Sequence, residues 1–145
     1  EKLIKEIIKN FSHNHNFVLE DNISSTDTFY NSDILLTDWS GVAYEYAFGT
    51  GRPILFIDVP QKIVNPRYKE LGLDPVDVAI RHKIGKVLKL ENINEVNDYV
   101  NDLIINKDNY SERINKVRDD MVYNFGTSSK VGATYIASLL DNWQK

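Results

Sequence analysis

Residues 38–41, with the sequence Asp-Trp-Ser-Gly, are the part of the chain best placed to bind a charged ligand. They follow an apolar run of strand length, residues 33–37, and precede a helical pattern. The backbone N–H groups of Ser40 and Gly41 would then be free at the positive end of a helix dipole. Such a turn, at the carboxyl end of a parallel strand, commonly holds a phosphate. It is a candidate anion-binding turn.

A simpler interpretation of this turn needs no ligand. Ser40 would only cap the helix and Asp38 would only shape the turn, because residues of these types begin most helices. Spacing alone favours this interpretation. The order strand, helix, strand predicts one βαβ unit of a parallel sheet, closed by a second apolar run at residues 53–57. The helix is predicted to start at Ser40, with Val42, Ala43, Tyr46 and Ala47 at helical spacing.

Residues 37–56 resemble a signature of the CDP-glycerol glycerophosphotransferase family, the teichoic-acid and capsule polymerases. The signature reads T-D-Y-S-S-V-x-F-D/E-x-A-x-x-x-K/R-P-x-I/L-F. Trp39 replaces its tyrosine and Gly41 replaces its second serine, which removes a hydroxyl donor but keeps the backbone N–H. The matching residues are Thr37, Asp38, Ser40, Val42, Glu45, Ala47, Arg52, Pro53, Leu55 and Phe56.

The resemblance implies a GT-B glycosyltransferase fold, of which this chain would be the donor-binding half. It also implies that Glu45 holds the ribose hydroxyls of the donor nucleotide, a geometry-specific contact for a carboxylate. Ser25 is added because its loop would rise at the same edge of a parallel sheet, although helix capping explains it nearly as well. The predicted donor site is Thr37, Asp38, Ser40, Gly41, Glu45 and Ser25.

The same resemblance implies that the catalytic residues lie outside this chain. The family has a His-Pro motif on a strand before the first helix, and a histidine in the N-terminal domain; this sequence contains no His-Pro. No catalytic residue is therefore assigned, and the isolated chain is expected to be inactive. The turn would neutralise the diphosphate of CDP-glycerol or a similar donor as its bond breaks, without metal or cofactor.

The histidines carry little chemistry by themselves. His13 and His15 form an H-x-H pair that a metal could bridge, but no third ligand lies nearby in the sequence. The pair also follows a helix end, where a cationic histidine interacts favourably with the dipole. His82 lies between Arg81 and Lys83, which could border a phosphate site or, more simply, form a solvated turn. No metal site is predicted.

Composition narrows the function classes. The chain has 145 residues, a formal net charge of −4 and 42% hydrophobic residues, which suit one globular domain. The charge argues weakly against nucleic acid and anionic membrane as partners. The absence of cysteine excludes disulfides and thiolate chemistry. No transmembrane run or signal peptide is evident, so a cytoplasmic protein is predicted, with peripheral membrane association of the parent enzyme implied by the resemblance.

The remaining patterns predict an α/β fold with a Rossmann-like, doubly wound parallel sheet, helices on both faces and a helical C-terminal third. Before the βαβ unit we expect a helix at 2–12, a strand at 16–20 and a short helix at 25–31. After it we expect a short helix at 66–71, an edge strand at 86–90, and three helices that begin at Asn92, at Ser111, and at Thr127 or Ser128.

Two further expectations concern packing and chain limits. Asn92 and Glu95 resemble a capping box, and the apolar stripes of the three last helices are predicted to be buried. An apolar helical stripe begins at Leu3, two positions after Glu1, so residues 1–145 are expected to be one domain excised from the C-terminal part of a longer enzyme.

The resemblance implies that the chain is the donor-nucleotide-binding domain of a transferase that adds alditol-phosphate or sugar units to a bacterial cell-surface polymer. Its partners would be the N-terminal half of the same enzyme, the nucleotide-activated donor and the polymer acceptor. The alternative is a non-catalytic α/β ligand-binding or receiver-like signalling module. In a receiver, Glu20 and Asp21 would form the acidic cluster and Asp58 would be the phosphoacceptor. Three consecutive C-terminal helices fit a receiver poorly.

Overall fold

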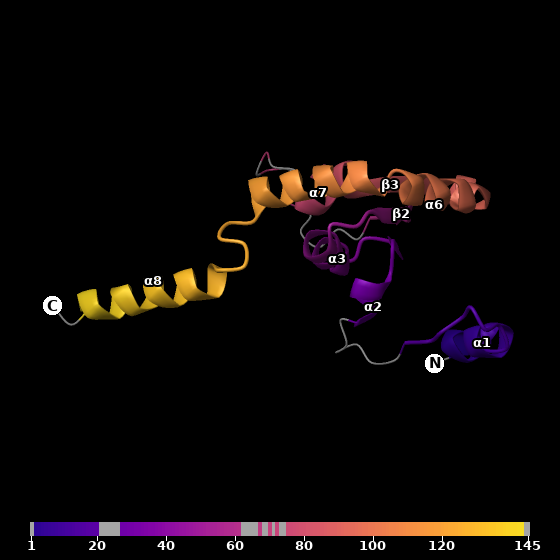
Figure 1. Ribbon diagram of the computed structural model, residues 1–145, viewed down its shortest axis with the longest axis horizontal. Coiled ribbons are helices and arrows are strands. Elements are labelled where there is room, and N and C mark those ends of the chain that lie inside the picture. The colour runs from indigo at the N-terminus through magenta and orange to yellow at the C-terminus, as the bar shows by residue number, and fades with distance from the viewer. Residues whose placement is uncertain are drawn as a thin grey trace. The chain divides into compact units, whose positions relative to one another are not determined.

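The computed structural model describes residues 2–20, 27–61, 67, 70, 72 and 75–143. The chain divides into two compact units, Glu1–Asn31 and Ser32–Lys145. Figure 1 labels several helices and strands of the two units, and each unit is described by itself below. The sheet and the candidate site belong to the second unit.

The first unit holds the helices α1 (Lys2–Phe11) and α2 (Asp27–Asn31). The predicted first helix is confirmed, and the short helix is confirmed over its described part. The strand expected at 16–20 is wrong, because these residues have no strand partner among the described residues. They instead follow a turn in which Phe17 N–H donates to Asn14 O at 2.9 Å. Val18 is 83% exposed, so an apolar run alone did not specify a buried strand here.

The second unit is built on a parallel sheet whose described strands have the order β1-β2-β3. The strands are β1 (Leu35–Thr37), β2 (Ile54–Asp58) and β3 (Gly85–Lys89). The parallel βαβ unit and the edge strand are confirmed, the latter one residue earlier than expected. Ile54, Leu55 and Phe56 of the central strand are buried, which explains why β2 reads as a continuous apolar run.

The helix α3 (Val42–Thr50) connects β1 with β2 and contacts β1. Ala43, Tyr46 and Ala47, which have helical spacing, are fully buried. The buried Tyr46 hydroxyl donates to Ser32 O at 2.8 Å, which satisfies its polar end. The helix ends at Gly51, whose positive φ of 69° lets its N–H bond Ala47 O at 2.8 Å.

Helices follow the second and third strands. They are α4 (Val76–Ala79), α5 (Arg81–Ile84), the 3₁₀ helix η2 (Leu90–Glu95), α6 (Val96–Ile105), α7 (Lys107–Met121) and α8 (Ser128–Trp143). α6 contacts β2 and β3, and Lys86 Nζ pairs with Asp102 Oδ2 at 2.6 Å between β3 and α6. α7 contacts α3, which precedes β2, and also α5 and α6, which flank β3 in the sequence.

Several predicted details of these helices are wrong. The capping box does not form, because Asn92 has non-helical φ and ψ inside η2 and α6 begins only after Glu95. α7 begins at Lys107 rather than at Ser111. The predicted helix at 66–71 falls largely outside the described residues. The third C-terminal helix does begin at Ser128.

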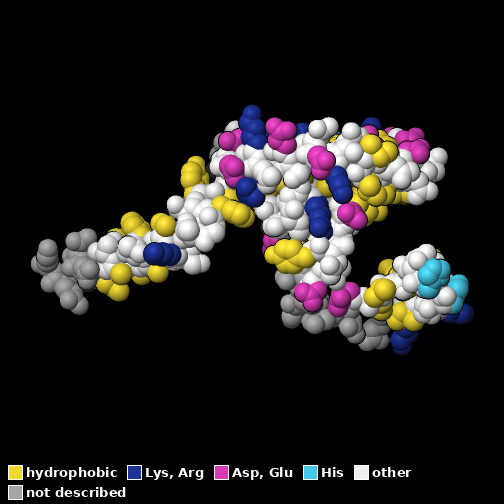
Figure 2. Space-filling model, viewed as in Figure 1, with side chains coloured by type: hydrophobic (Ala, Val, Ile, Leu, Met, Phe, Trp, Pro, Cys, Tyr) yellow, Lys and Arg dark blue, Asp and Glu magenta, His cyan; other side chains and the backbone are white. Residues whose placement is uncertain are grey.

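The apolar side chains of the last three helices are buried only in part, whereas the sequence predicted that these stripes would be buried. Leu103 and Ile114 are fully buried, but Ile104 is exposed. In α8 the apolar side chains that were expected to pack are exposed, and hydrophobic side chains are visible along this helix in Figure 2. No helix among the described residues has the length and apolar character needed to cross a bilayer. The described residues also contain no group of three or more potential metal ligands.

Candidate functional site at the carboxyl edge of the sheet

The candidate site lies where the parallel strands end. Thr37 is the last residue of β1 and is in register with Phe56 of β2. Asp58, the last residue of β2, is in register with Lys89 of β3. Because the strands are parallel, these ends lie at one edge of the sheet, and residues 38–41 follow directly from it. The sheet therefore brings the predicted turn and the end of β2 to the same edge.

The start of α3 carries unused backbone donors. Ser40 O accepts Ala43 N–H at 3.2 Å, and Gly41 O accepts Tyr44 N–H at 3.1 Å. The N–H groups of Ser40, Gly41 and Val42 have no acceptor within the described part of the chain. With the positive end of a nine-residue helix behind them, these three donors are suited to hold an anion.

Ser40 does not cap the helix with its side chain, so this prediction is wrong. The N-cap is Gly41, which has helical φ and ψ of −61° and −25° and makes no side-chain cap bond. A glycine has no side chain that can accept from the first turn, and the orphan N–H groups are left for another acceptor. A Cβ at Gly41 would meet no atom within 4 Å, so the space beside this residue is open.

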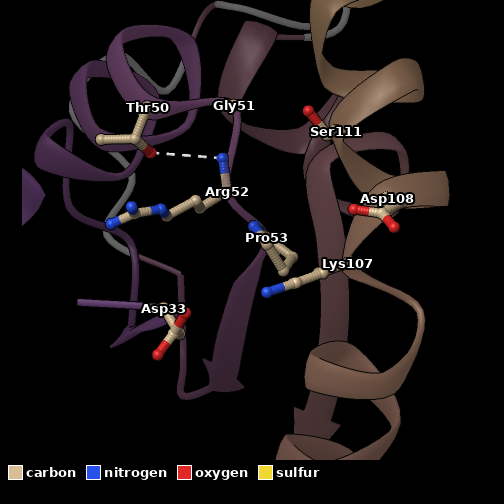
Figure 3. A pocket seen from close by; sticks show the side chains of 8 residues that line it. All are labelled: Asp33, Thr50, Gly51, Arg52, Pro53, Lys107, Asp108 and Ser111. Atoms are coloured by element: carbon tan, nitrogen blue, oxygen red, sulfur yellow. Dashed lines mark hydrogen bonds between the residues drawn. The ribbon is translucent and has the colours of Figure 1, made fainter. Parts of the chain in front are cut away.

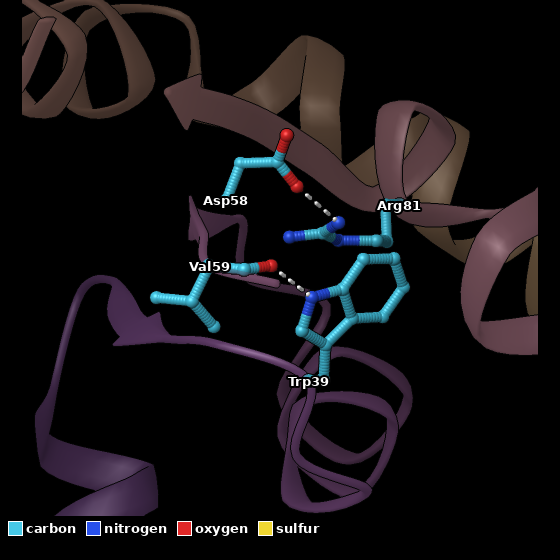
Figure 4. Close-up of polar contacts among 4 residues, drawn as sticks. All are labelled: Trp39, Asp58, Val59 and Arg81. Atoms are coloured by element: carbon cyan, nitrogen blue, oxygen red, sulfur yellow. Dashed lines mark hydrogen bonds and ion pairs between the residues drawn. The ribbon is translucent and has the colours of Figure 1, made fainter. Parts of the chain in front are cut away.

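Trp39 ties the turn to the neighbouring strand. Its indole Nε1 donates to Val59 O at 2.8 Å, just beyond the end of β2 (Figure 4). Half-burial of Trp39 and this bond between residues 20 positions apart fix the turn relative to the sheet edge. The aromatic residue at this position therefore has a structural function that needs an indole N–H.

Arg81 is a polar residue of this edge that the sequence offered only as part of a basic segment around His82. Its side chain is 4% exposed, and Nη1 pairs with Asp58 Oδ1 at 3.0 Å. The guanidinium carbon lies 3.8 Å from the centroid of the Trp39 ring and 4.9 Å from that of Phe56, and Figure 4 shows the stack on Trp39. Nε and Nη2 are buried and have no hydrogen-bond partner within the described part of the chain. Its only sequence signal is a charged residue between the buried Ile80 and Ile84.

Tyr44 and Glu45 occupy the first turn of α3. Burial of the Tyr44 hydroxyl, and secondarily the negative charge of Asp77, raise the pKa of Tyr44 to about 12, while the positive charge of Arg81 opposes this rise. Glu45 is exposed and is free to contact a ligand. The first turn therefore presents one neutral phenol and one carboxylate beside the unused N–H groups.

We expect the Tyr44 hydroxyl to ionise well above the usual range of a tyrosine, because its burial raises its pKa. Because its folded-state pKa of about 12 exceeds the usual value of about 10, its contribution to stability is full below pH 10 and is lost as the pH rises toward 12. Alkaline titration of tyrosinate absorbance should show a step near pH 12 that Tyr44→Phe removes. Tyr123→Phe, at an exposed position, should leave that step in place. An unchanged step in Tyr44→Phe would contradict the burial of this phenol.

The structure places five of the six predicted donor-site residues on one segment. Thr37, Asp38, Ser40, Gly41 and Glu45 run from the end of β1 into α3, whereas Ser25 lies outside the described residues. The segment around His82 is not a solvated turn throughout, because Arg81 is buried in α5 while His82 and Lys83 are exposed. The His82 carbonyl accepts from Arg113 Nη2 at 2.6 Å, and its neighbour Arg81 is buried against Trp39.

A separate hollow of about 220 Å³ lies at the opposite edge of the sheet. It is lined by Gly51, Arg52 and Pro53, which precede β2, and by Lys107, Asp108 and Ser111 at the start of α7 (Figure 3). The positive charges of Arg52 and Lys107 in this hollow are equal in number to the negative charges of Asp33 and Asp108. Arg52 Nη1 also donates a hydrogen bond to Ser32 O at 2.6 Å. This hollow shares no residue with the carboxyl-edge turn, so it is not part of the candidate site.

Comparison with known proteins adds one finding. The model of a family described as CDP-Glycerol:Poly(glycerophosphate) glycerophosphotransferase matches residues 2–131, which is most of the chain. No curated protein and no solved structure matches it. The matched range includes the whole sheet, the turn before α3 and Arg81.

Proposed function

The chain belongs to the CDP-glycerol:poly(glycerophosphate) glycerophosphotransferase family, and we propose that it carries the site that binds the nucleotide donor of such a transferase. The observation that carries the proposal is the set of three unused N–H groups at Ser40, Gly41 and Val42, at the carboxyl edge of a parallel sheet. The family match supplies the ligand that fits them, a nucleoside diphosphate linked to glycerol.

In the proposed complex the diphosphate of CDP-glycerol lies on the start of α3. The backbone N–H groups donate to its phosphoryl oxygens, and the helix dipole favours their negative charge. The open space beside Gly41 admits a phosphate close to the backbone. Glu45, exposed in the first turn, accepts hydrogen bonds from the ribose hydroxyls. Thr37 and Asp38 border the site from the end of β1.

The reaction in this proposal is the transfer of a glycerophosphate unit. A hydroxyl at the end of the acceptor polymer attacks the phosphorus that carries glycerol, and the bond from this phosphorus to the bridging oxygen breaks. CMP leaves with the bridging oxygen and the bonding electrons. The hydroxyl proton passes to a general base, and no residue of this chain is assigned that function. The turn would act by positioning and by stabilising the charge that develops on the leaving phosphate.

The proposal extends to the whole enzyme of which this chain would be a part. We propose that the chain is one half of a GT-B enzyme with a doubly wound sheet, completed by an N-terminal half that supplies the acceptor site and the base. The parent enzyme would act at the cytoplasmic face of the membrane on a teichoic-acid or capsule polymer. The parallel sheet and the family match support this assignment.

The test is a titration of the 145-residue chain with CDP, followed by amide chemical shifts. We expect the shifts to cluster at residues 37–45 without added divalent metal. A dissociation constant between high micromolar and millimolar, about −4 to −6 kcal/mol, suits half of a two-domain cleft. Gly41→Val should abolish these shifts, because its branched side chain would occupy the space that a phosphate needs.

The matched control is Gly49→Val. Gly49 lies in the same helix, and a Cβ there also meets no atom within 4 Å. This variant should bind CDP as the unchanged chain does, while both variants keep the circular-dichroism spectrum of the fold. Shifts that cluster elsewhere, or no shifts at millimolar CDP, would overturn the donor-site proposal.

A further inference from the structure

The guanidinium of Arg81 is incompletely used by the protein. Nη1 has an acceptor in Asp58, but Nε and Nη2 are buried without a hydrogen-bond partner among the residues that the structure describes. Buried polar groups of folded proteins are almost always paired, and an unpaired donor on a charged group is especially unfavourable. An exception of this kind indicates that something other than the protein completes the site.

The position of Arg81 indicates what completes it. The side chain is held between Asp58 at the end of β2 and the ring of Trp39 in the turn, so it lies at the edge where α3 begins. Its charge also acts on the Tyr44 hydroxyl in the first turn of α3. The unused side of a buried cation and the unused N–H groups of a helix start thus lie at the same edge of the sheet.

We propose that Arg81 is a donor-binding residue, whose Nε–H and Nη2–H donate together to a phosphoryl oxygen of the nucleotide diphosphate while Nη1 stays paired with Asp58. This inference rests on the proposed donor site and adds a second element to it. A guanidinium presents Nε–H and an Nη–H side by side, a geometry that matches phosphate. The diphosphate would then be held by α3 on one side and by Arg81 on the other.

Burial of these nitrogens has a consequence for Trp39. Nε and Nη2 are shielded from solvent, and the guanidinium stacks on Trp39 and Phe56. A phosphoryl oxygen therefore reaches them only after a rearrangement, which we infer to include the turn that carries Trp39. Asp58 can hold the guanidinium in place during that movement, because it pairs with Nη1 from β2 rather than from the turn. Donor binding should therefore change the stacking of Arg81 on Trp39, which indole fluorescence reports.

The first test compares Arg81→Lys with Arg118→Lys. Lysine keeps the positive charge but loses the paired N–H groups. Arg118 is a matched control because it also pairs with a carboxylate, Asp119, at 3.0 Å and lies 4.4 Å from an aromatic centroid, that of Phe125. We expect Arg81→Lys to raise the dissociation constant for CDP about tenfold to hundredfold, the range for hydrogen bonds to charged groups.

The same variant should bind cytidine, which has no phosphate, as the unchanged chain does. Arg118→Lys should bind both ligands normally. A uniform loss for CDP and cytidine in Arg81→Lys would show a merely structural role, and normal CDP binding would also overturn the inference.

A second test needs no substitution at Arg81. In the unaltered chain the Nε–H signal of Arg81 should shift when CDP or inorganic pyrophosphate is added, and not with cytidine. In a Trp143→Phe background, where Trp39 is the only tryptophan, emission should change with the same ligands. CDP-induced shifts at residues 37–45 with an unmoved Arg81 Nε–H would overturn this inference and leave the donor site standing. Absence of the shifts at 37–45 would remove the donor site itself.

Discussion

Gly85→Ala should lower the free energy of unfolding by about 3 kcal/mol or more, because the change places a methyl group against backbone. Gly85 opens β3 and is in register with Ile54 of β2. An added Cβ would overlap Ile54 O and lie 2.8 Å from the Ile54 carbonyl carbon. The φ of −177° is extended backbone that alanine adopts readily, so the expected effect is purely steric. Urea unfolding followed by circular dichroism measures it.

Gly49→Ala is the matched control for this change. Gly49 lies within α3, and a Cβ there meets no atom within 4 Å. Alanine is favoured over glycine in a helix, so this variant should gain about 0.5–1 kcal/mol. If Gly85→Ala unfolded at the same urea concentration as the unaltered chain, the close pairing of β2 with β3 at this position would be disproved.

Ile114→Ala should lower the free energy of unfolding by about 2–5 kcal/mol, the range for removing a large aliphatic side chain from a core. Ile114 is fully buried on α7, the helix that contacts α3 and α5. The cavity would therefore open next to α3, which follows the turn at residues 38–41, and next to α5, which carries Arg81. Chemical denaturation of the purified variant gives the value.

The control for this loss is Ile105→Ala at the end of α6. Ile105 is 80% exposed, so the same truncation should change stability by no more than about 0.5 kcal/mol. Equal losses at Ile105 and Ile114 would contradict the burial pattern of the last helices. A small loss of unfolding free energy in Ile114→Ala would show that Ile114 is not part of the core of this unit.

The sequence predicted the βαβ unit because its signals are local. The apolar runs of β1 and β2, and the spacing of Ala43, Tyr46 and Ala47, lie within 25 residues of one another. The parallel order of the strands then places the turn at the carboxyl edge. The donor-site residues Thr37 to Glu45 are continuous in the sequence, so they could be proposed together from one motif.

Arg81 could not be predicted in the same way. Its partners, Asp58 and Trp39, are 23 and 42 positions away, and neither contact leaves a periodic pattern. Beside His82 and Lys83, it looked like part of a solvated basic turn. Only the folded chain shows that Ile80 and Ile84 carry the residue between them into the core.

Amphipathic periodicity had a related limit. It correctly predicted helices at α1 and α8, but it says only that one face is apolar and not what covers that face. The exposed Leu3 and Ile4 of α1, and Tyr135 and Leu140 of α8, illustrate this distinction. The expected strand at 16–20 failed for a similar reason, because a strand requires a partner that its own residues do not specify.

The simple order of the three strands also bears on how the sheet assembles. Leu35 pairs with Ile54, 19 positions later, and Ile54 pairs with Gly85, 31 positions later. The entropy of loop closure rises so slowly with length that these two pairings differ by less than about 0.6 kcal/mol. The length of chain between the strands therefore does not decide which of the two pairings forms first. The order of assembly is then governed by which strand residues bury apolar surface first, and those belong mainly to β2.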